Sequence, residues 1–161
     1  MKIGVVSDTH NNLKNVGRIV ELFNAYGVEQ VIHTGDITQA KTLDVFAHLQ
    51  APLCGVYGNN DQERDSLHAA VNTHGFHFQE PPFELTLAGR HIVVVHDPLD
   101  FADALTGAHE LALHGHTHLH RFETREHQVF FNPGECAGHM PGFNAIGVVD
   151  LLDLSAELLR F

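Results

Sequence analysis

The sequence has little of what would cross-link it or bind it to polyanions and membranes. Its 161 residues include only two cysteines, Cys54 and Cys136, and their separation fits neither a disulfide framework nor a zinc knuckle. It has 9 lysines and arginines against 20 aspartates and glutamates, and the formal net charge of -11 excludes a broad grip on duplex nucleic acid. No apolar run could span a bilayer, and Asp8 interrupts the opening one before it reaches signal-peptide length. We therefore expect a cytoplasmic protein with no membrane partner and no extended nucleic-acid duplex as partner.

What the first half does contain is an alternation of short apolar runs with amphipathic segments. The runs at residues 3–6, 31–33 and 53–57 predict buried strands. Strands that alternate with helices form a parallel sheet with right-handed crossovers, and sites in such sheets lie outside the carboxyl ends of the strands. The first predicted helix is capped by Asn11 or Asn12 and ends at Gly27. The second is capped by Thr38, and its Leu43, Phe46 and Ala47 face inward. The third contains Leu67, Ala70 and Val71 and ends near Gly75.

After Pro82 the regular alternation of strands with helices gives way to consecutive strands. Residues 83–87 alternate apolar with polar side chains, and a turn at 88–90 leads into the wholly apolar strand 92–95. No internal repeat, linker or low-complexity tract divides the chain, so we predict a single domain over residues 1–161. Further predicted elements are a short helix at 99–106, a strand at 111–113, and hairpins that join 121–123 to 129–131 and 145–151 to 154–161.

Acidic, amide and histidine side chains recur where the predicted strands end. Asp8 and His10 follow the first strand, and His116 and His118 repeat their spacing later in the chain. Extended backbone would point each pair to the same side. Any one of these groups alone is more typical of a turn or of a surface histidine. The remaining members of this set of candidate ligands are Asp36, Asn59 and His96.

Seven oxygen and nitrogen donors are too many for one ion. They suit two divalent cations with Asp36 between them, because a carboxylate has two oxygens to share. Two metals about 3.5–4 Å apart are a recurring device for in-line attack at phosphorus.

Taken together and in this order, the motifs resemble the calcineurin-like metallophosphoesterase superfamily, and the loop Asn132-Pro133-Gly134-Glu135-Cys136 resembles its small bacterial and archaeal phosphodiesterase branch. The motifs are Asp8-x-His10, Gly35-Asp36, Gly58-Asn59-Asn60-Asp61, His96 and Gly115-His116-x-His118. The resemblance covers the chain from Met1 to at least Cys136 and implies an α/β fold, a four-layer α/β/β/α sandwich of the metallophosphoesterase type. It also implies that Asp8, His10 and His118 hold one metal, that Asn59, His96 and His116 hold the other, and that Asp36 bridges them.

On this resemblance we expect a metal-dependent phosphodiesterase, a hydrolase of small phosphoester substrates, with manganese, iron, nickel or zinc as the two divalent metal ions. A hydroxide that bridges the two ions would attack phosphorus in line, because bound cations lower the pKa of water. The natural ester, whether a monoester, a linear diester, a cyclic nucleotide or an oligonucleotide, stays open. Exposed apolar positions on the terminal hairpins are compatible with a homodimer.

Two positions depart from the superfamily pattern, and both are catalytic candidates. Many members follow the metal-binding asparagine with a histidine that protonates the leaving group, but an amide such as Asn60 cannot act as a general acid. We therefore expect Asn60 to hydrogen-bond a phosphoryl oxygen, and the protein to prefer good leaving groups. Asp97 follows His96 where glycine is usual, and it could orient a ligand, protonate the leaving group or point to solvent.

Two alternatives belong to other classes. The same fold serves as a non-catalytic adaptor that binds protein partners, but an adaptor can lose its imidazole ligands and this chain keeps them. A metallo-β-lactamase-type hydrolase would group His-x-His-x-Asp-His, and the run from His116 to Arg121 lacks the final Asp-His pair.

Other polar side chains near the motifs receive different interpretations. We expect His33 to be a satisfied core histidine and Asp61 to cap a helix. His139 lies on a loop that could border the substrate pocket, and a packing role explains it at least as well.

Overall fold

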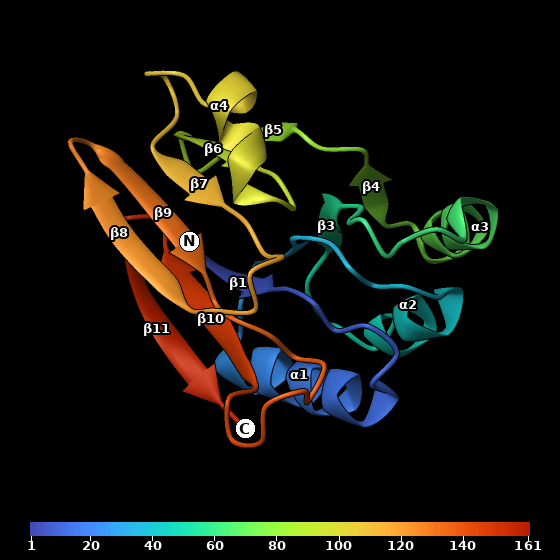
Figure 1. Ribbon diagram of the computed structural model, residues 1–161. Coiled ribbons are helices and arrows are strands. Elements are labelled where there is room, and N and C mark those ends of the chain that lie inside the picture. The colour runs from blue at the N-terminus through green and yellow to red at the C-terminus, as the bar shows by residue number, and fades with distance from the viewer.

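A six-stranded sheet forms the centre of the computed structural model, which describes residues 1–161 (Figure 1). Its order is β11-β10-β1-β2-β3-β4, in which β1 to β4 run parallel and the hairpin of β10 and β11 joins β1 in the antiparallel direction. The strands are β1 Lys2–Val6, β2 Gln30–His33, β3 Leu53–Val56, β4 His77–Gln79, β10 Ala145–Asp150 and β11 Ser155–Arg160.

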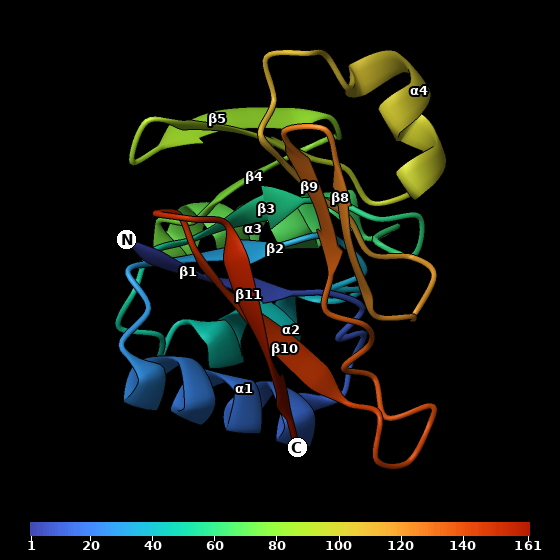
Figure 2. The same ribbon diagram turned by 90° about the vertical axis from the view of Figure 1, so that its left-hand side faces the viewer.

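A second, five-stranded sheet packs on the first. Strands β6 (Arg90–Val94), β7 (Leu111–Leu113) and β9 (Gln128–Asn132) run parallel at its centre. The antiparallel strands β5 (Phe83–Leu87) and β8 (Arg121–Arg125) form its edges. The order is therefore β5-β6-β7-β9-β8. Figure 2 shows α1 and α2 on one side of the strands and α4 on the other.

Three apolar clusters separate the four layers. The helices α1 (Leu13–Tyr26), α2 (Ala40–Phe46) and α3 (Arg64–His74) pack on the outer face of the six-stranded sheet, and α4 (Phe101–Ala104) packs on the outer face of the five-stranded sheet. The third cluster fills the space between the sheets. The predicted α/β/β/α sandwich is confirmed. Both sheets contribute to this middle cluster, as expected if residues 1–161 form a single domain. The single domain stays a prediction.

Strand β1 shows how the sequence creates these layers. Alternate strand residues face opposite sides, so Ile3 and Val5 enter the cluster between the sheets while Val6 faces the helices. Gly4 also faces the helices, and a Cβ added there would lie 2.5 Å from Cε1 of Phe23. A larger residue at this position would therefore push α1 off the sheet.

Local signals predicted α1 well and α2 poorly. Asn12 caps α1 by accepting from the Asn15 N–H at 3.2 Å, and Gly27 ends it with φ of 75°. The predicted cap of α2 at Thr38 is wrong, because the residue before α2 is Gln39 and Thr38 is a left-handed residue with φ of 75°. Ala47 is exposed rather than inward-facing.

Two shorter elements also differ from the prediction. The helix expected at 99–106 is a turn of 3-10 helix, η1 (Pro98–Asp100), followed by α4, which ends at Ala104. Strand β4 was not predicted, because it has only three residues and a single buried side chain, Phe78. No helix in the structure has the length and apolarity needed to cross a bilayer.

Candidate metal centre

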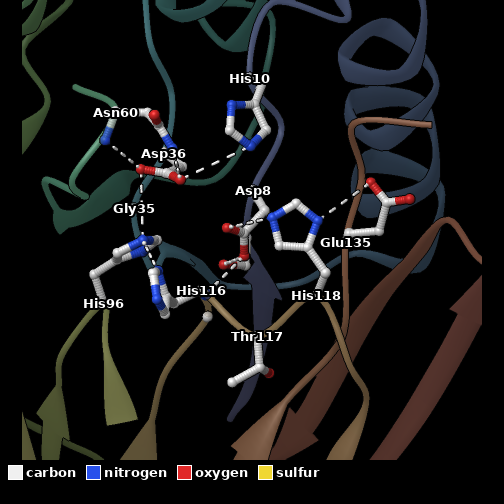
Figure 3. A network of polar contacts seen from close by, with 12 residues as sticks. Asp8, His10, Gly35, Asp36, Asn60, His96, His116, Thr117, His118 and Glu135 are labelled. Atoms are coloured by element: carbon white, nitrogen blue, oxygen red, sulfur yellow. Dashed lines mark hydrogen bonds and ion pairs between the residues drawn. The ribbon is translucent and has the colours of Figure 1, made fainter. Parts of the chain in front are cut away.

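All of the predicted ligands follow the carboxyl ends of strands in the two sheets. Figure 3 shows six of them around one site, namely Asp8, His10, Asp36, His96, His116 and His118. Asp8 and His10 follow β1, Asp36 follows β2 and Asn59 follows β3. From the other sheet, His96 follows β6, and both His116 and His118 follow β7. The topology therefore brings together side chains that are more than 100 residues apart in the sequence, as between Asp8 and His118.

One group of donors surrounds Asp8. Its Oδ1 lies 3.3 Å from Nε2 of His118, and donor atoms of Asp8, His10 and His118 all lie within 4.8 Å of one another. The other oxygen, Oδ2, accepts hydrogen bonds from the Ser7 hydroxyl and from the His116 N–H at 3.1 Å. Asp8 is thus fixed through one oxygen while the other faces the imidazoles.

The second group converges on Asn59. Its Oδ1 lies 2.9 Å from Nε2 of His96 and 3.1 Å from Nδ1 of His116, and these two nitrogens are 3.3 Å apart. The Thr34 carbonyl lies 2.9 Å from the other nitrogen of His96, Nδ1, which can donate to it. With its proton at Nδ1, His96 presents a lone pair at Nε2 toward the Asn59 oxygen. Such converging lone pairs favour a cation between them.

Asp36 lies between the two groups. Its Oδ2 is 3.8 Å from Nε2 of His10, and its Oδ1 is 3.5 Å from Nε2 of His96. Burial alone would raise the pKa of Asp36, but hydrogen bonds and charge from His96, with hydrogen bonds from Asn60, hold that pKa below its ordinary value. The Asp36 carboxylate is therefore ionised throughout the neutral range. In turn, with no cation bound, hydrogen bonding and charge from Asp36 outweigh the effect of burial on His96 and raise its pKa to about 8, so a cation at Nε2 would replace a proton there.

The buried carboxylates lack the partners that would normally compensate their charge. Asp8 is 0% exposed and Asp36 is 1% exposed, and only histidines form ion pairs with them. Asp8 Oδ1 and His10 Nε2 are both buried without a hydrogen-bond partner. Unpaired buried charge is costly unless a counter-charge is bound. A set of imidazole, carboxylate and amide donors fits manganese, iron, nickel or zinc ions.

The backbone of the site is strained. Five of the predicted ligands have left-handed backbone, a conformation that costs of order 1 kcal/mol or more for a residue other than glycine. The extended geometry expected for Asp8 with His10 and for His116 with His118 is therefore wrong. Asp8 and His10 still meet, whereas His116 and His118 belong to different donor groups. Backbone hydrogen bonds from their N–H groups to the carbonyls of Gly35 and Asp36 hold the turn after β1 in place. The φ values are 50° at Asp8, 44° at His10, 61° at Asp36, 65° at His116 and 57° at His118.

The two catalytic candidates take different positions. Asn60 donates from its backbone N–H to Asp36 Oδ1 at 2.9 Å and from its side-chain amide to Asp36 Oδ2 at 2.7 Å. Its backbone N–H and one N–H of its side-chain amide are thus engaged with Asp36 in this structure. Asp97 Oδ1 accepts from the Leu99 N–H at 2.9 Å and caps η1, while its Oδ2 lies 3.7 Å from His116 Nε2. Their catalytic roles stay predictions.

Two other side chains near the motifs can now be placed. His33 is confirmed as a satisfied core histidine, because it is buried between the Thr9 hydroxyl at 3.0 Å and the Gly35 N–H at 3.1 Å. Burial lowers the pKa of His33 to about 3, so it is neutral. Asp61 does not cap α3. It accepts instead from the N–H groups of Asp36, Thr38 and Gly58, and so ties the loops after β2 and β3 together.

Gly58 gives a test of how tightly these two loops pack. A Cβ at this position would lie 2.6 Å from the backbone nitrogen of Asp36 and closer still to its Oδ1. We expect Gly58→Ala to displace Asp36, to destabilise the protein by about 1–3 kcal/mol, and to lower the melting temperature by roughly 3–10 °C. Scanning calorimetry would measure this shift. Gly17→Ala is the control, because nothing lies within 4 Å of its added Cβ in α1. Equal melting temperatures for the two variants would contradict the tight packing.

Glu135 lies in the loop from Asn132 to Cys136 and was not predicted to be a site residue. Glu135 is buried at 0% exposure beside His118, with Oε2 3.9 Å from Nδ1 of that ring. Donor atoms of His118, Glu135 and His139 also lie within 4.8 Å of one another. No local signal marks a buried glutamate in a Gly- and Pro-rich loop, because its burial comes from the packing of that loop on the first turn of α1.

Comparison with known proteins identifies the family. The model of the calcineurin-like phosphoesterase superfamily domain matches residues 1–155. The chain belongs to this superfamily. Phosphodiesterase MJ0936 of Methanocaldococcus jannaschii is 34% identical over 160 residues, which cover 93% of each chain.

Solved structures agree with this assignment. A structure described as a novel archaeal phosphodiesterase is 31% identical and superposes with a TM-score of 0.91 over 100% of both chains. Vps29 of Chaetomium thermophilum, at 16% identity and a TM-score of 0.71 over 100% of this chain and 94% of that one, shares the fold alone. The predicted resemblance to the small bacterial and archaeal branch is confirmed, as is the prediction of a phosphoric ester hydrolase.

Proposed function

We propose that the protein is a phosphodiesterase that works with two divalent cations at the candidate metal centre. Asp8, His10 and His118 would hold one ion, Asn59, His96 and His116 the other, and Asp36 would bridge them. The observation that carries the proposal is that each oxygen of Asp36 faces a different donor group, Oδ2 toward His10 and Oδ1 toward His96. One carboxylate can therefore serve both ions.

Bound divalent cations supply a nucleophile from water near neutral pH and offset the charge that develops on the phosphoryl oxygens. The chain's own residues fix the ligands that hold the ions. The Thr34 carbonyl orients His96, the Ser7 hydroxyl orients Asp8, and the two N–H donors of Asn60 hold the plane of the Asp36 carboxylate. Such outer contacts keep the ligands in the orientation that a metal needs.

A cavity beside the second donor group could receive the substrate. It encloses about 320 Å³, and its lining includes Asn59, His96 and His116 of that donor group together with Arg64 and Asp97. This volume suits a small phosphoester. It is too small for a duplex, which the net charge of -11 would also repel.

The absence of a histidine at position 60 predicts a strong dependence on the leaving group. Asn60 cannot donate a proton to it, and a missing general acid costs about 10²–10⁴-fold for a poor leaving group. We expect aryl phosphodiesters to be hydrolysed fast and alkyl ones slowly, with log kcat/KM falling steeply as the pKa of the leaving alcohol rises. A series of substituted phenyl diesters measures that slope. A flat line would mean that another residue, such as Asp97, supplies the proton.

The proposed function is tested by a paired assay on chromogenic mono- and diesters. The metal-free protein would be loaded in turn with manganese, iron, nickel or zinc, beside Asn59→Ala and His118→Ala as ligand variants. We expect turnover of the diester only with added metal, and a loss of at least about 100-fold in each variant. No turnover with any metal would leave the adaptor alternative, which at present rests on the fold alone.

Three narrower expectations go with this proposal. Manganese is one of four candidate metals, and the cytoplasm is the expected location. A homodimer would cover exposed apolar side chains on the hairpins, such as Phe122 and the 80%-exposed Leu152.

A further inference from the structure

Glu135 is a buried carboxylate that the function proposed above does not use. It lies after β9, and the Cys136 N–H donates to the carbonyl of Asp8 at 3.2 Å, so this loop lies directly against the metal centre. Glu135 Oε1 accepts from the Met140 N–H at 2.9 Å, whereas Oε2 is buried with no hydrogen-bond partner. No lysine or arginine forms an ion pair with it. A carboxylate oxygen in this position needs a donor.

His118 is the side chain that can supply that donor. Its Nδ1 lies 3.9 Å from Glu135 Oε2, and its Nε2 lies 3.3 Å from Asp8 Oδ1. Figure 3 shows the ring between these two carboxylates. A neutral imidazole that offers Nε2 to a cation carries its proton on Nδ1. That proton faces Glu135. A shift of about 1 Å would bring the two atoms to hydrogen-bond distance.

The same atoms could instead be taken for a third cation site, made by His118, Glu135 and His139. Such a site would need the lone pair of His118 Nδ1 while Nε2 serves the metal centre, so the ring would have to lose both of its N–H protons. His139 is exposed and packs parallel to the His118 ring, with centroids 5.4 Å apart. The geometry therefore favours a hydrogen bond from His118 to Glu135 over a shared imidazole.

We propose that Glu135 is a positioning residue of the metal centre, whose Oε2 accepts the Nδ1–H of His118 and fixes that ring with Nε2 toward Asp8. The negative charge of Glu135 also makes His118 a stronger ligand, as carboxylates behind metal-bound histidines do. Glu135 acts through His118 and does not touch the substrate. The inference rests on the proposed function, since it assumes that His118 binds a metal.

The test compares Glu135→Gln with wild-type protein. In glutamine an NH2 group replaces one of the two carboxylate oxygens, so a donor group must face either the Met140 N–H or the Nδ1–H of His118. After removal of metals with a chelator, Zn²⁺ would be titrated by calorimetry and counted per chain. We expect the variant to bind Zn²⁺ about 10–100-fold more weakly at the affected site, with the same number of ions and a metal-free melting temperature within a few degrees of wild type. Asn15→Ala is the matched control, because Asn15 donates to the Cys136 carbonyl at 2.7 Å and so holds the same loop without facing His118.

Several results would overturn the inference. Wild-type affinity in Glu135→Gln would leave Glu135 only as an anchor of its loop, and equal weakening in Asn15→Ala would assign the effect to loop packing. The loss of one ion per chain would point to a third cation site. If Glu135→Gln does not fold, the wild-type protein loaded with Zn²⁺ should still show a slowly exchanging, downfield Nδ1–H resonance from His118, and its absence would refute the bond. A wild-type protein that binds no Zn²⁺ would instead refute the proposed function itself.

Discussion

Replacing Asp36 with asparagine should lower kcat/KM for a phosphodiester by about 1,000-fold, equivalent to about 4 kcal/mol of transition-state stabilisation. Asp36 is the residue whose two oxygens face separate donor groups, at 3.8 Å from His10 and 3.5 Å from His96. An amide of the same shape keeps one oxygen and replaces the other with an N–H group, which repels a cation. Steady-state kinetics at saturating metal would measure the loss.

Stability separates this effect from unfolding. Asp36→Asn removes a buried charge, so the melting temperature of the metal-free protein should stay within a few degrees of wild type. The control is Asp44→Asn, the same chemical change on the exposed side of α2, where the carboxylate pairs only with His74 at 2.8 Å. Asp44→Asn should retain wild-type kcat/KM. Activity in Asp36→Asn within tenfold of wild type would contradict a bridging role.

Removing the metals should lower the melting temperature by roughly 10–20 °C. A cation at 100 times its Kd stabilises a folded protein by about 2.7 kcal/mol, and two such sites give roughly 5 kcal/mol. In a protein of this size each kcal/mol corresponds to about 2–4 °C. The physical cause is the buried carboxylates Asp8 and Asp36, which form ion pairs only with histidines when no cation is bound.

Scanning calorimetry in a chelator, and then with excess Mn²⁺ or Zn²⁺, would measure the difference. Mg²⁺ is a useful comparison, because an imidazole-rich site binds it weakly and it should restore little of the loss. A melting temperature that is the same with and without metal would mean that the buried carboxylates do not hold cations in the folded protein.

The candidate site was predictable from the sequence because it depends on topology. Asp36 and Asn59 gather with Asp8 since parallel strands end at the same edge of a sheet, and this holds whatever the local conformation. The extended backbone predicted at Asp8 and His10 was wrong, because both residues have left-handed backbone. Their predicted position at the end of β1 was nevertheless correct.

Features that depend on distant contacts were not predictable. Thr38 reads as a helix cap in the sequence, but Asp61, 23 residues later, accepts its N–H and holds it outside α2. Glu135 reads as a surface residue in a loop, and only the packing of that loop on α1 buries it beside His118. In contrast, the ends of α1 at Asn12 and Gly27 were predicted because each is made by residues within one turn of the helix.

The most direct test of the cation pair is anomalous diffraction from crystals of the protein grown with Mn²⁺ or Zn²⁺. We expect two anomalous peaks about 3.5–4 Å apart. One peak should lie among Asp8, His10 and His118 and the other beside His96, with one oxygen of Asp36 directed at each. A single peak, or two peaks that do not share Asp36, would contradict the dinuclear centre.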